Sequence, residues 1–175
     1  QHDTFKPTYE AQADKFETQG CTVWGTENGI EFLEKEVLGI ERNYEELPPY
    51  IGAGIHPDRG GDPHKVCDWI HNNGLAEAPK YPFPTTKDAL LVILGLKYPK
   101  ENWDREFLHQ WVIFGNKTKE ERIEAIKSAL QYGTVGVSVS AWNKKNGIYV
   151  DGGIPNNHWC VCYGWTDEGW KIFDS

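Results

Sequence analysis

The sequence contains no methionine at any of its 175 positions, including the first. Because an ordinary start codon places methionine at the beginning of a chain, we expect a processed product or a domain excised from a larger parent polypeptide. Long apolar runs are also missing, since the longest, Ala89 to Leu96, is far shorter than the about 20 residues that cross a bilayer. The N-terminus has no basic and then apolar signal pattern, so no membrane association is predicted.

Positive charge is scarce as well. Lysine and arginine together number 18 against 26 aspartates and glutamates, which gives a net charge of −8. An acidic chain repels the phosphates of nucleic acids and of anionic lipids, so neither is predicted as a partner.

Cysteine is too sparse for a disulfide framework, because a secreted domain held by bridges would spread more cysteines through its loops. Two of the four, Cys160 and Cys162, alternate in an apolar run, and Cys67 lies in a helical pattern. We expect these three in the core, and a reducing compartment for the chain. The fourth, Cys21, is considered below.

Hydrophobic residues make up 39% of the chain and aromatic residues 13%, which is enough to form the core of one folded domain over residues 1–175. Helical periodicity dominates up to residue 132, and a Pro- and Gly-rich stretch at 47–62 indicates a loop. The predicted helices are Cys21 to about Leu38, Pro63 to Asn73, Thr86 to Leu96, and one that begins after Thr118 with a Thr-x-x-Glu capping box.

The pattern changes after Gly133. Residues 135–139, 158–163 and 170–173 are rich in β-forming residues, which predicts an antiparallel sheet. Helices followed by strands indicate an α+β fold with an N-terminal helical lobe at about 10–132 and a C-terminal β lobe at about 133–175. A cleft between the lobes is the expected place for an active site.

Cys21 stands where the first predicted helix begins. The positive end of a helix macrodipole and its unpaired N–H groups stabilise a thiolate, so this position suits a nucleophile. The alternative is a small buried side chain without chemistry.

His158 begins one predicted strand, and Asp174 ends the next. If the hairpin turns at Asp167, Gly164 faces Glu168 and His158 faces Asp174, which makes the imidazole and the carboxylate cross-strand neighbours. A carboxylate in this position fixes the histidine tautomer and stabilises the imidazolium, as in a Cys-His-Asp triad. A purely structural His–Asp pair is the alternative.

Four segments, in this order, resemble the papain family of cysteine peptidases. Residues 21–31 (CTVWGTENGIE) resemble its nucleophile helix, with Glu31 ten residues after the cysteine. Residues 60–63 (GGDP), followed by a helix and by Tyr81-Pro82, are similar to its substrate wall. Residues 129–139 resemble its passage into the β lobe, and Asn157-His158 with Gly164 and Asp174 resembles its histidine hairpin.

The resemblance implies a papain-like fold and acyl transfer to Cys21, with an oxyanion hole formed by the Cys21 N–H and an upstream glutamine. The family's glutamine position holds Lys15 here. Gln12 is the preferred replacement, because a longer loop can bring it back, and Gln19 is the alternative. The chain also departs from the family at Thr22, where tryptophan is usual, and at Asp174, where asparagine is usual.

The resemblance also implies that Gly60 and Gly61 let an extended substrate backbone approach, whereas a plain turn is the alternative. A nearby group of histidines and aspartates lacks the spacing of a metal site, so neither a metal nor another cofactor is expected; these residues are His56, Asp58, Asp62 and His64.

The function implied is that of a thiol protease, a hydrolase acting on a peptide or protein substrate. The layout resembles papain-like domains of large phage virion proteins, which implies a cytoplasmic or virion-associated location. Two alternatives remain open: a peptidoglycan amidase or endopeptidase on the same scaffold, and a catalytically silent structural or binding module of a virion protein.

Overall fold

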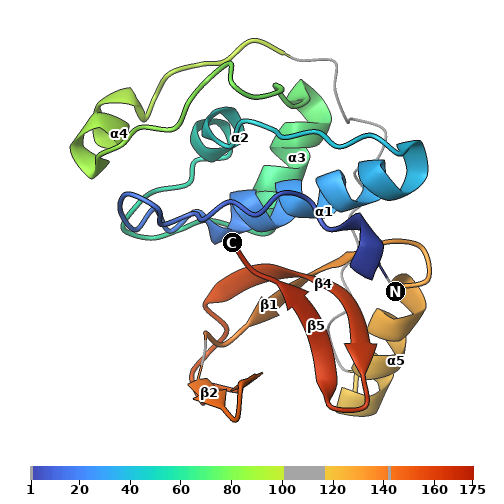
Figure 1. Ribbon diagram of the computed structural model, residues 1–175. Helices are drawn as coiled ribbons and strands as arrows, with labels where there is room; N and C mark the ends of the chain where they lie inside the picture. The colour runs from blue at the N-terminus through green and yellow to red at the C-terminus, as the bar shows by residue number, and fades with distance from the viewer. Residues whose placement is uncertain (1, 101–116, 142) are drawn as a thin grey trace.

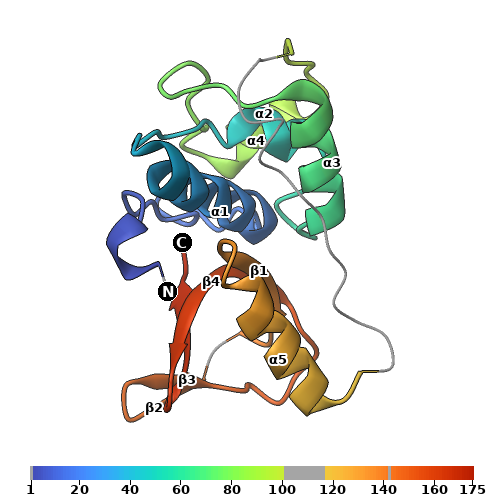
Figure 2. The ribbon, with the colours of Figure 1, turned by 90° about the vertical axis from the view of Figure 1, so that its right-hand side faces the viewer.

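The computed structural model describes residues 2–100, 117–141 and 143–175 and has a mixed architecture of helices and antiparallel sheets (Figure 1). The helix α1 forms a middle layer, with α2, α3 and α4 on one side and the larger sheet on the other. Figure 2 shows α5 alongside that sheet. The helices are η1 (Asp3–Phe5), α1 (Cys21–Leu38), α2 (Leu47–Gly52), α3 (Pro63–Asn73), α4 (Lys87–Ile93) and α5 (Lys119–Ala129). The strands are β1 (Val135–Val139), β2 (Asn143–Lys145), β3 (Ile148–Val150), β4 (His158–Thr166) and β5 (Gly169–Phe173).

The predicted α+β class is confirmed at this level, and several predicted helix boundaries agree with the structure. Helix α3 begins at Pro63 after Asp62, whose side chain accepts from the His64 N–H. Helix α5 has the predicted capping box, in which Thr118 and Glu121 bond reciprocally. None of the helices in the described ranges is both long and apolar enough to span a membrane.

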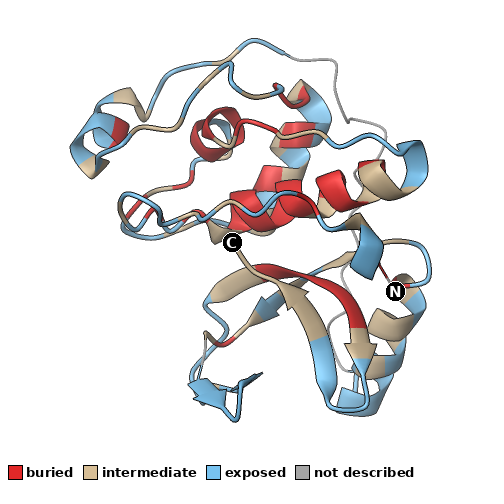
Figure 3. Cartoon of the chain, viewed as in Figure 1, coloured by how far each residue is buried: buried red, intermediate tan, exposed pale blue. Residues whose placement is uncertain are grey.

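Helix α1 contributes to two hydrophobic cores. Val23 and Ile30 pack into the helical layer, with α2 and α3. Phe32 packs instead on Val161 and Tyr163 of β4. Figure 3 shows the resulting buried residues along α1, α2 and the middle of β4. Because both faces of α1 are covered, its position relative to β4 is fixed, and so is the distance between their first residues.

The larger sheet has the order β1-β4-β5, with antiparallel pairing throughout. In β1, Val139 pairs with His158, so His158 stands at the end of the sheet. The β4–β5 hairpin turns through two residues between Thr166 and Gly169, and a register shift between Cys162 and Gly164 marks a bulge.

Two expectations about the helices were wrong, and one small sheet was missed. The stretch 47–62 contains helix α2, because the consecutive prolines Pro48 and Pro49 occupy its first turn, where no N–H is needed. Helix α4 ends at Ile93 instead of Leu96. A second sheet, β2–β3, was not predicted, although Asn146 and Gly147 adopt positive φ angles of 52° and 82° that suit a tight hairpin turn.

Candidate active site

Cys21 is the first residue of α1, as predicted, and it is a half-buried free thiol. Gly20 precedes it as the N-cap, and its carbonyl accepts from the Val23 N–H at 2.8 Å. A side chain at Gly20 is excluded, because a Cβ there would lie 2.4 Å from the Trp24 ring. As the first residue of α1, Cys21 has no helical residue four positions earlier to accept from its backbone N–H. The thiol and this N–H therefore occupy the same helix end.

His158 and Asp174 meet at the end of the sheet beside α1. The His158 Nε2 atom lies 2.5 Å from the Asp174 Oδ1 atom. The predicted register was wrong, however, since Gly164 pairs with Lys171 and Val161 with Phe173. The two-residue turn and the bulge shift the strands so that Asp174 comes nearest to Cys160 in register. His158 reaches the carboxylate as a diagonal neighbour on the same face.

The His158 imidazole also forms a hydrogen bond with Cys21. Because Nε2 is bonded to Asp174, Nδ1 is the ring atom available to the thiol. Burial disfavours the charged imidazolium, but the hydrogen bonds and negative charges of Asp174 and Cys21 outweigh it and raise the pKa of His158 to about 9. A neutral-pH imidazolium beside a helix-end sulfur is the arrangement that stabilises a thiolate.

Trp159, the residue after His158, fixes the spacing between α1 and β4. A Cβ at Gly25 of α1 would lie 2.7 Å from Trp159 Cδ1, and one at Gly136 of β1 would lie 2.2 Å from Trp159 Cζ2. The indole therefore occupies space that two glycines leave open. The only sequence signal for this contact is a glycine inside a helix, which is unfavourable without a packing reason.

We predict that Gly25→Ala disturbs the site while Gly29→Ala does not. The added methyl at Gly25 would contact Trp159 too closely, which should cost about 1–3 kcal/mol of unfolding free energy and displace His158 from Cys21. At Gly29, four residues later on α1, a Cβ would lie 3.6 Å from Thr134 Oγ1, an ordinary contact. Thermal unfolding and the rate of Cys21 alkylation measure both effects. Equal behaviour of the two variants would contradict this role for Trp159.

The two candidate glutamines differ in their surroundings. The backbone carbonyl of Gln12 accepts from Thr18 Oγ1 at 3.0 Å, and its Oε1 atom is buried without a hydrogen-bond partner among the described residues. Gln19 has a positive φ of 55° and an exposed side chain. Its backbone N–H donates to Glu17 Oε1 at 2.8 Å. The structure thus gives Gln12, and not Gln19, a partly enclosed side-chain amide.

Gly60 lies against the segment that leads to Cys21. It has a φ of 66° and closes a turn in which its N–H donates to the His56 carbonyl at 2.8 Å. A Cβ at Gly60 would lie 3.3 Å from the Gln19 carbonyl oxygen. At Gly61, a Cβ would lie 2.0 Å from Ile55 Cδ1, so packing excludes a side chain there. Both glycines serve the turn, and Gly60 also borders the segment that leads to Cys21.

The nearby histidines and aspartates have local structural contacts. His56 Nδ1 accepts from the Asp58 N–H at 3.2 Å, and the Asp58 carboxylate pairs with Lys87. Asp62 caps α3 by accepting from the His64 N–H at 2.9 Å. Within the parts of the chain that the structure describes, no group of three or more histidine, cysteine, aspartate and glutamate side chains is placed to hold a metal ion.

The remaining thiols differ from Cys21. Cys160 and Cys162 are each 1% exposed, as expected for core residues, whereas Cys67 is half-buried. Burial raises the pKa of Cys67 to about 11 and that of Cys162 to about 11, and it also raises the pKa of Cys160. All three therefore remain protonated near neutral pH, which makes them poor nucleophiles.

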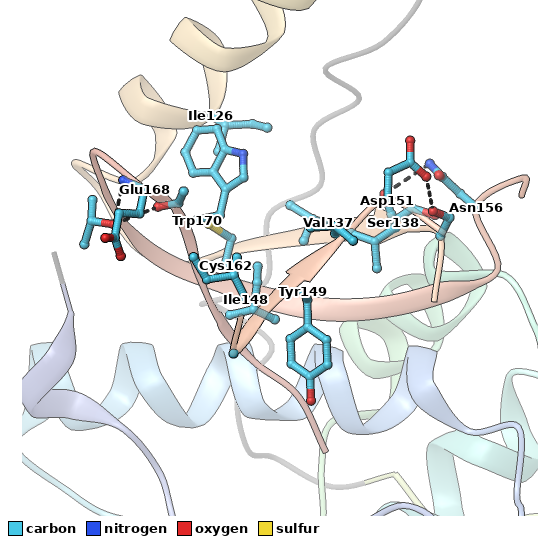
Figure 4. A pocket seen from close by; sticks show the side chains of 17 residues that line it. Ile126, Val137, Ser138, Ile148, Tyr149, Asp151, Asn156, Cys162, Glu168 and Trp170 are labelled. Carbon is cyan, nitrogen blue, oxygen red and sulfur yellow. Dashed lines mark hydrogen bonds between the residues drawn. The ribbon is translucent and has the colours of Figure 1, made fainter. Parts of the chain in front are cut away.

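A pocket of about 650 Å³ lies elsewhere, between the β2–β3 hairpin and the face of the larger sheet that does not pack on α1 (Figure 4). Val137, Tyr149 and Trp170 contribute to its lining, whereas Cys21, His158 and Asp174 do not. The candidate site is therefore defined by the contacts among these three side chains and not by this cavity.

Sequence reasoning missed Thr18, which is 3% exposed and bridges the loop before Cys21. It also missed Tyr50 of α2, whose hydroxyl donates to the Thr18 carbonyl at 2.7 Å across 32 residues. No local sequence pattern predicts a contact between residues so far apart in the chain.

A search of protein-family models and of curated proteins finds no match for the chain.

Proposed function

We propose that the chain is a papain-like cysteine peptidase that hydrolyses peptide bonds through Cys21, His158 and Asp174. The observation that carries the proposal is that one imidazole has two hydrogen-bond partners. His158 bonds to Asp174 at 2.5 Å and also to the thiol of Cys21 at the start of α1. These residues come from positions 21, 158 and 174 of the chain. A histidine that bridges a thiol and a carboxylate is the arrangement that thiol acyl transfer requires.

The proposed reaction has two steps. In the first, the Cys21 thiolate attacks the carbonyl carbon, and the His158 imidazolium donates a proton to the amine as the C–N bond breaks. In the second, His158 takes a proton from water as the water oxygen attacks the thioester; the C–S bond then breaks, which releases the acid and restores the Cys21 thiolate beside the His158 imidazolium. Asp174 holds the imidazole by its Nε2 atom and stabilises its positive charge throughout.

The helical layer and the sheet would then correspond to the two lobes of the papain-like fold, with Cys21 and His158 facing each other from α1 and β4. The backbone N–H of Cys21 and the amide of Gln12 would stabilise the oxyanion, and the Gly60 turn would border the substrate. In support of the last point, Gly60 already lies against Gln19, two residues before the nucleophile. Aspartate at position 174, where the papain family usually has asparagine, adds a negative charge that stabilises the imidazolium of His158.

The test is selective alkylation. At about pH 7, iodoacetamide or an epoxide probe should modify Cys21 at least about tenfold faster than the other three thiols, because Cys21 begins a helix and hydrogen-bonds to His158, whereas burial raises the pKa of the other three. Mass spectrometry of the labelled peptides measures each site. Cys21→Ala should abolish the fast phase, His158→Ala should slow it to the rate of an ordinary thiol, and Cys67→Ala should leave it intact.

The outcomes separate the alternatives. Slow labelling shared among all four cysteines would contradict the enzyme and favour a silent papain-like module. Fast labelling with cleavage of muropeptides, and not of denatured proteins, would redirect the proposal to a peptidoglycan amidase or endopeptidase.

A further inference from the structure

The loop between Gln12 and Cys21 is closed by one side chain. Thr18 Oγ1 donates to the Gln12 carbonyl at 3.0 Å and accepts from the Gly20 N–H at 3.1 Å. One hydroxyl therefore joins the residue before the nucleophile to the candidate oxyanion glutamine. Since Thr18 is 3% exposed, these bonds do not compete with water.

The Thr18 backbone is itself anchored to the helical layer. The hydroxyl of Tyr50, a fully buried residue of α2, donates to the Thr18 carbonyl at 2.7 Å. Gly20 is held on its other side by the Trp24 ring. The part of the loop next to Cys21 is thus held at both Thr18 and Gly20, and Thr18 links it to Gln12.

We infer that Thr18 is a positioning residue for the oxyanion hole: by bonding to both Gln12 and Gly20 it sets the separation between the Gln12 amide and the Cys21 N–H. The inference rests on the proposed function and assigns a role that the Cys-His-Asp geometry alone does not. The two donors are carried by separate parts of the loop, and the Thr18 hydroxyl is a direct link between those parts.

The side-chain oxygen of Gln12 is not held by another hydrogen bond among the described residues, so the amide can act as an oxyanion donor. Its Oε1 atom is buried and has no hydrogen-bond partner within the described residues. The terminal torsion of glutamine has broad, roughly two-fold preferences, so a rotation places the NH₂ group where the oxygen stands. With the NH₂ group turned to that position, the amide can donate a hydrogen bond to a negatively charged oxygen beside it.

The experiment compares two reactions of the same thiol in the full chain. Alkylation by iodoacetamide forms the C–S bond with loss of iodide and develops no oxyanion. Acylation by p-nitrophenyl acetate passes through a tetrahedral oxyanion, as sulfur bonds to the carbonyl carbon and the bond to p-nitrophenolate then breaks. Thr18→Val, which keeps the shape and removes the hydroxyl, should slow acylation about tenfold or more and alkylation less than about twofold.

Two further variants make the result specific. Thr18→Ser restores the hydroxyl and should recover most of the acylation rate. Tyr50→Phe removes only the anchor on the Thr18 carbonyl and should show a smaller loss in the same direction, and it carries the test if Thr18→Val does not fold. Gln12→Ala should match the acylation defect of Thr18→Val, and the double variant should show less than the sum of the two losses, because Gln12→Ala removes the same donor that Thr18→Val displaces.

Equal loss of both reactions in Thr18→Val, or no loss in either, would overturn the assignment and leave Thr18 as a structural residue or a neutral one. A wild-type chain that is alkylated slowly would instead overturn the proposed function. The two failures are therefore distinguishable in one set of measurements.

Discussion

Replacement of Asp174 by alanine is expected to lower the rate of acyl transfer by on the order of 10²- to 10³-fold. The carboxylate lies 2.5 Å from His158 Nε2 and is among the groups that raise the pKa of that histidine to about 9. Without the carboxylate, Cys21 alone offsets the effect of burial, which lowers the pKa of His158. The imidazolium therefore becomes less stable, and its ring loses the hydrogen bond that orients it. Both the proton donor and its orientation are lost.

Asp174→Asn is the matched control for orientation. Its Oδ1 atom can still accept from the His158 ring, but it carries no charge, so the rate should fall by only about tenfold or less. The pH profile separates the two properties of the carboxylate. In the wild type, acyl transfer should decline as the pH rises through about 9, where His158 loses its proton. In Asp174→Asn, the decline should begin at lower pH.

Rates of amide cleavage, measured with a labelled protein substrate across this pH range, provide the test, because an amine leaving group needs the proton of His158. Alkylation should not decline above pH 9, since it needs the thiolate and no proton donor. If Asp174→Ala retained the wild-type rate and alkaline limb, the pair would be structural. If Asp174→Asn were as impaired as Asp174→Ala, charge and not orientation would be the main contribution.

The parts of the fold that sequence predicts are those with local chemical signals. Pro63 and Gly74 mark the two ends of α3, and the capping box at Thr118 marks the start of α5. Cys21 and His158 could be chosen for a similar reason, because each begins an element. Helix α2 was missed because a pair of prolines is as typical of a loop as of a first helical turn.

The geometry between distant residues could not be predicted in the same way. The His158–Asp174 contact was expected from a register that the structure contradicts: Thr166 pairs with Gly169 and Gly164 with Lys171, because the spacing of residues alone does not fix where a hairpin turns. His158 and Asp174 are nevertheless in contact, because long side chains reach diagonal as well as directly opposite neighbours on the same face of a sheet. The bridge from Tyr50 to Thr18 has no local signal at all.

The charged residues of α1 show the same limit. Glutamates within a helix usually predict a solvent-facing side, but α1 lies between the helical layer and the sheet. Glu27, Glu31 and Glu34 are therefore all buried. Glu34 is compensated, since it pairs with Arg42 and accepts from the Tyr44 hydroxyl. Glu27 is not: neither of its oxygens has a hydrogen-bond partner among the described residues.

Other carboxyls surround Glu27 and share its environment. Burial and the charges of Glu46, Glu31, Glu10 and Glu45 raise the pKa of Glu27 well above its usual value. Burial raises the pKa of Glu31 to about 8, although the Tyr44 N–H at 3.2 Å opposes this. Burial and a hydrogen bond to Glu10 raise the pKa of Glu46 to about 9. Each of these carboxyls holds a proton at pH values where an exposed glutamate has lost it.

The stability of the fold should consequently fall as the pH rises. An unfolded glutamate has a pKa near its ordinary value of 4.5, whereas the pKa of folded Glu31 is about 8 and that of folded Glu46 is about 9. The stability is fully present below the unfolded pKa, and it decreases as the pH rises toward the folded pKa, because the unfolded chain releases protons that the folded chain retains. The loss should be on the order of 2–4 kcal/mol, or roughly 5–10 °C in the melting temperature, between about pH 5 and pH 8.

Glu27→Gln identifies the cluster as the cause. Glutamine keeps the shape but cannot ionise, so the variant should unfold at about the wild-type temperature near pH 5 and at a higher temperature near pH 8. The slope below about pH 6.5 is the decisive part, since His158 titrates only above that range. Glu124→Gln on α5, where the side chain is 74% exposed, is the control and should keep the wild-type slope. A wild-type melting temperature that rises from pH 5 to pH 8, or a slope that Glu27→Gln leaves unchanged, would show that the cluster is ionised and compensated in the folded chain.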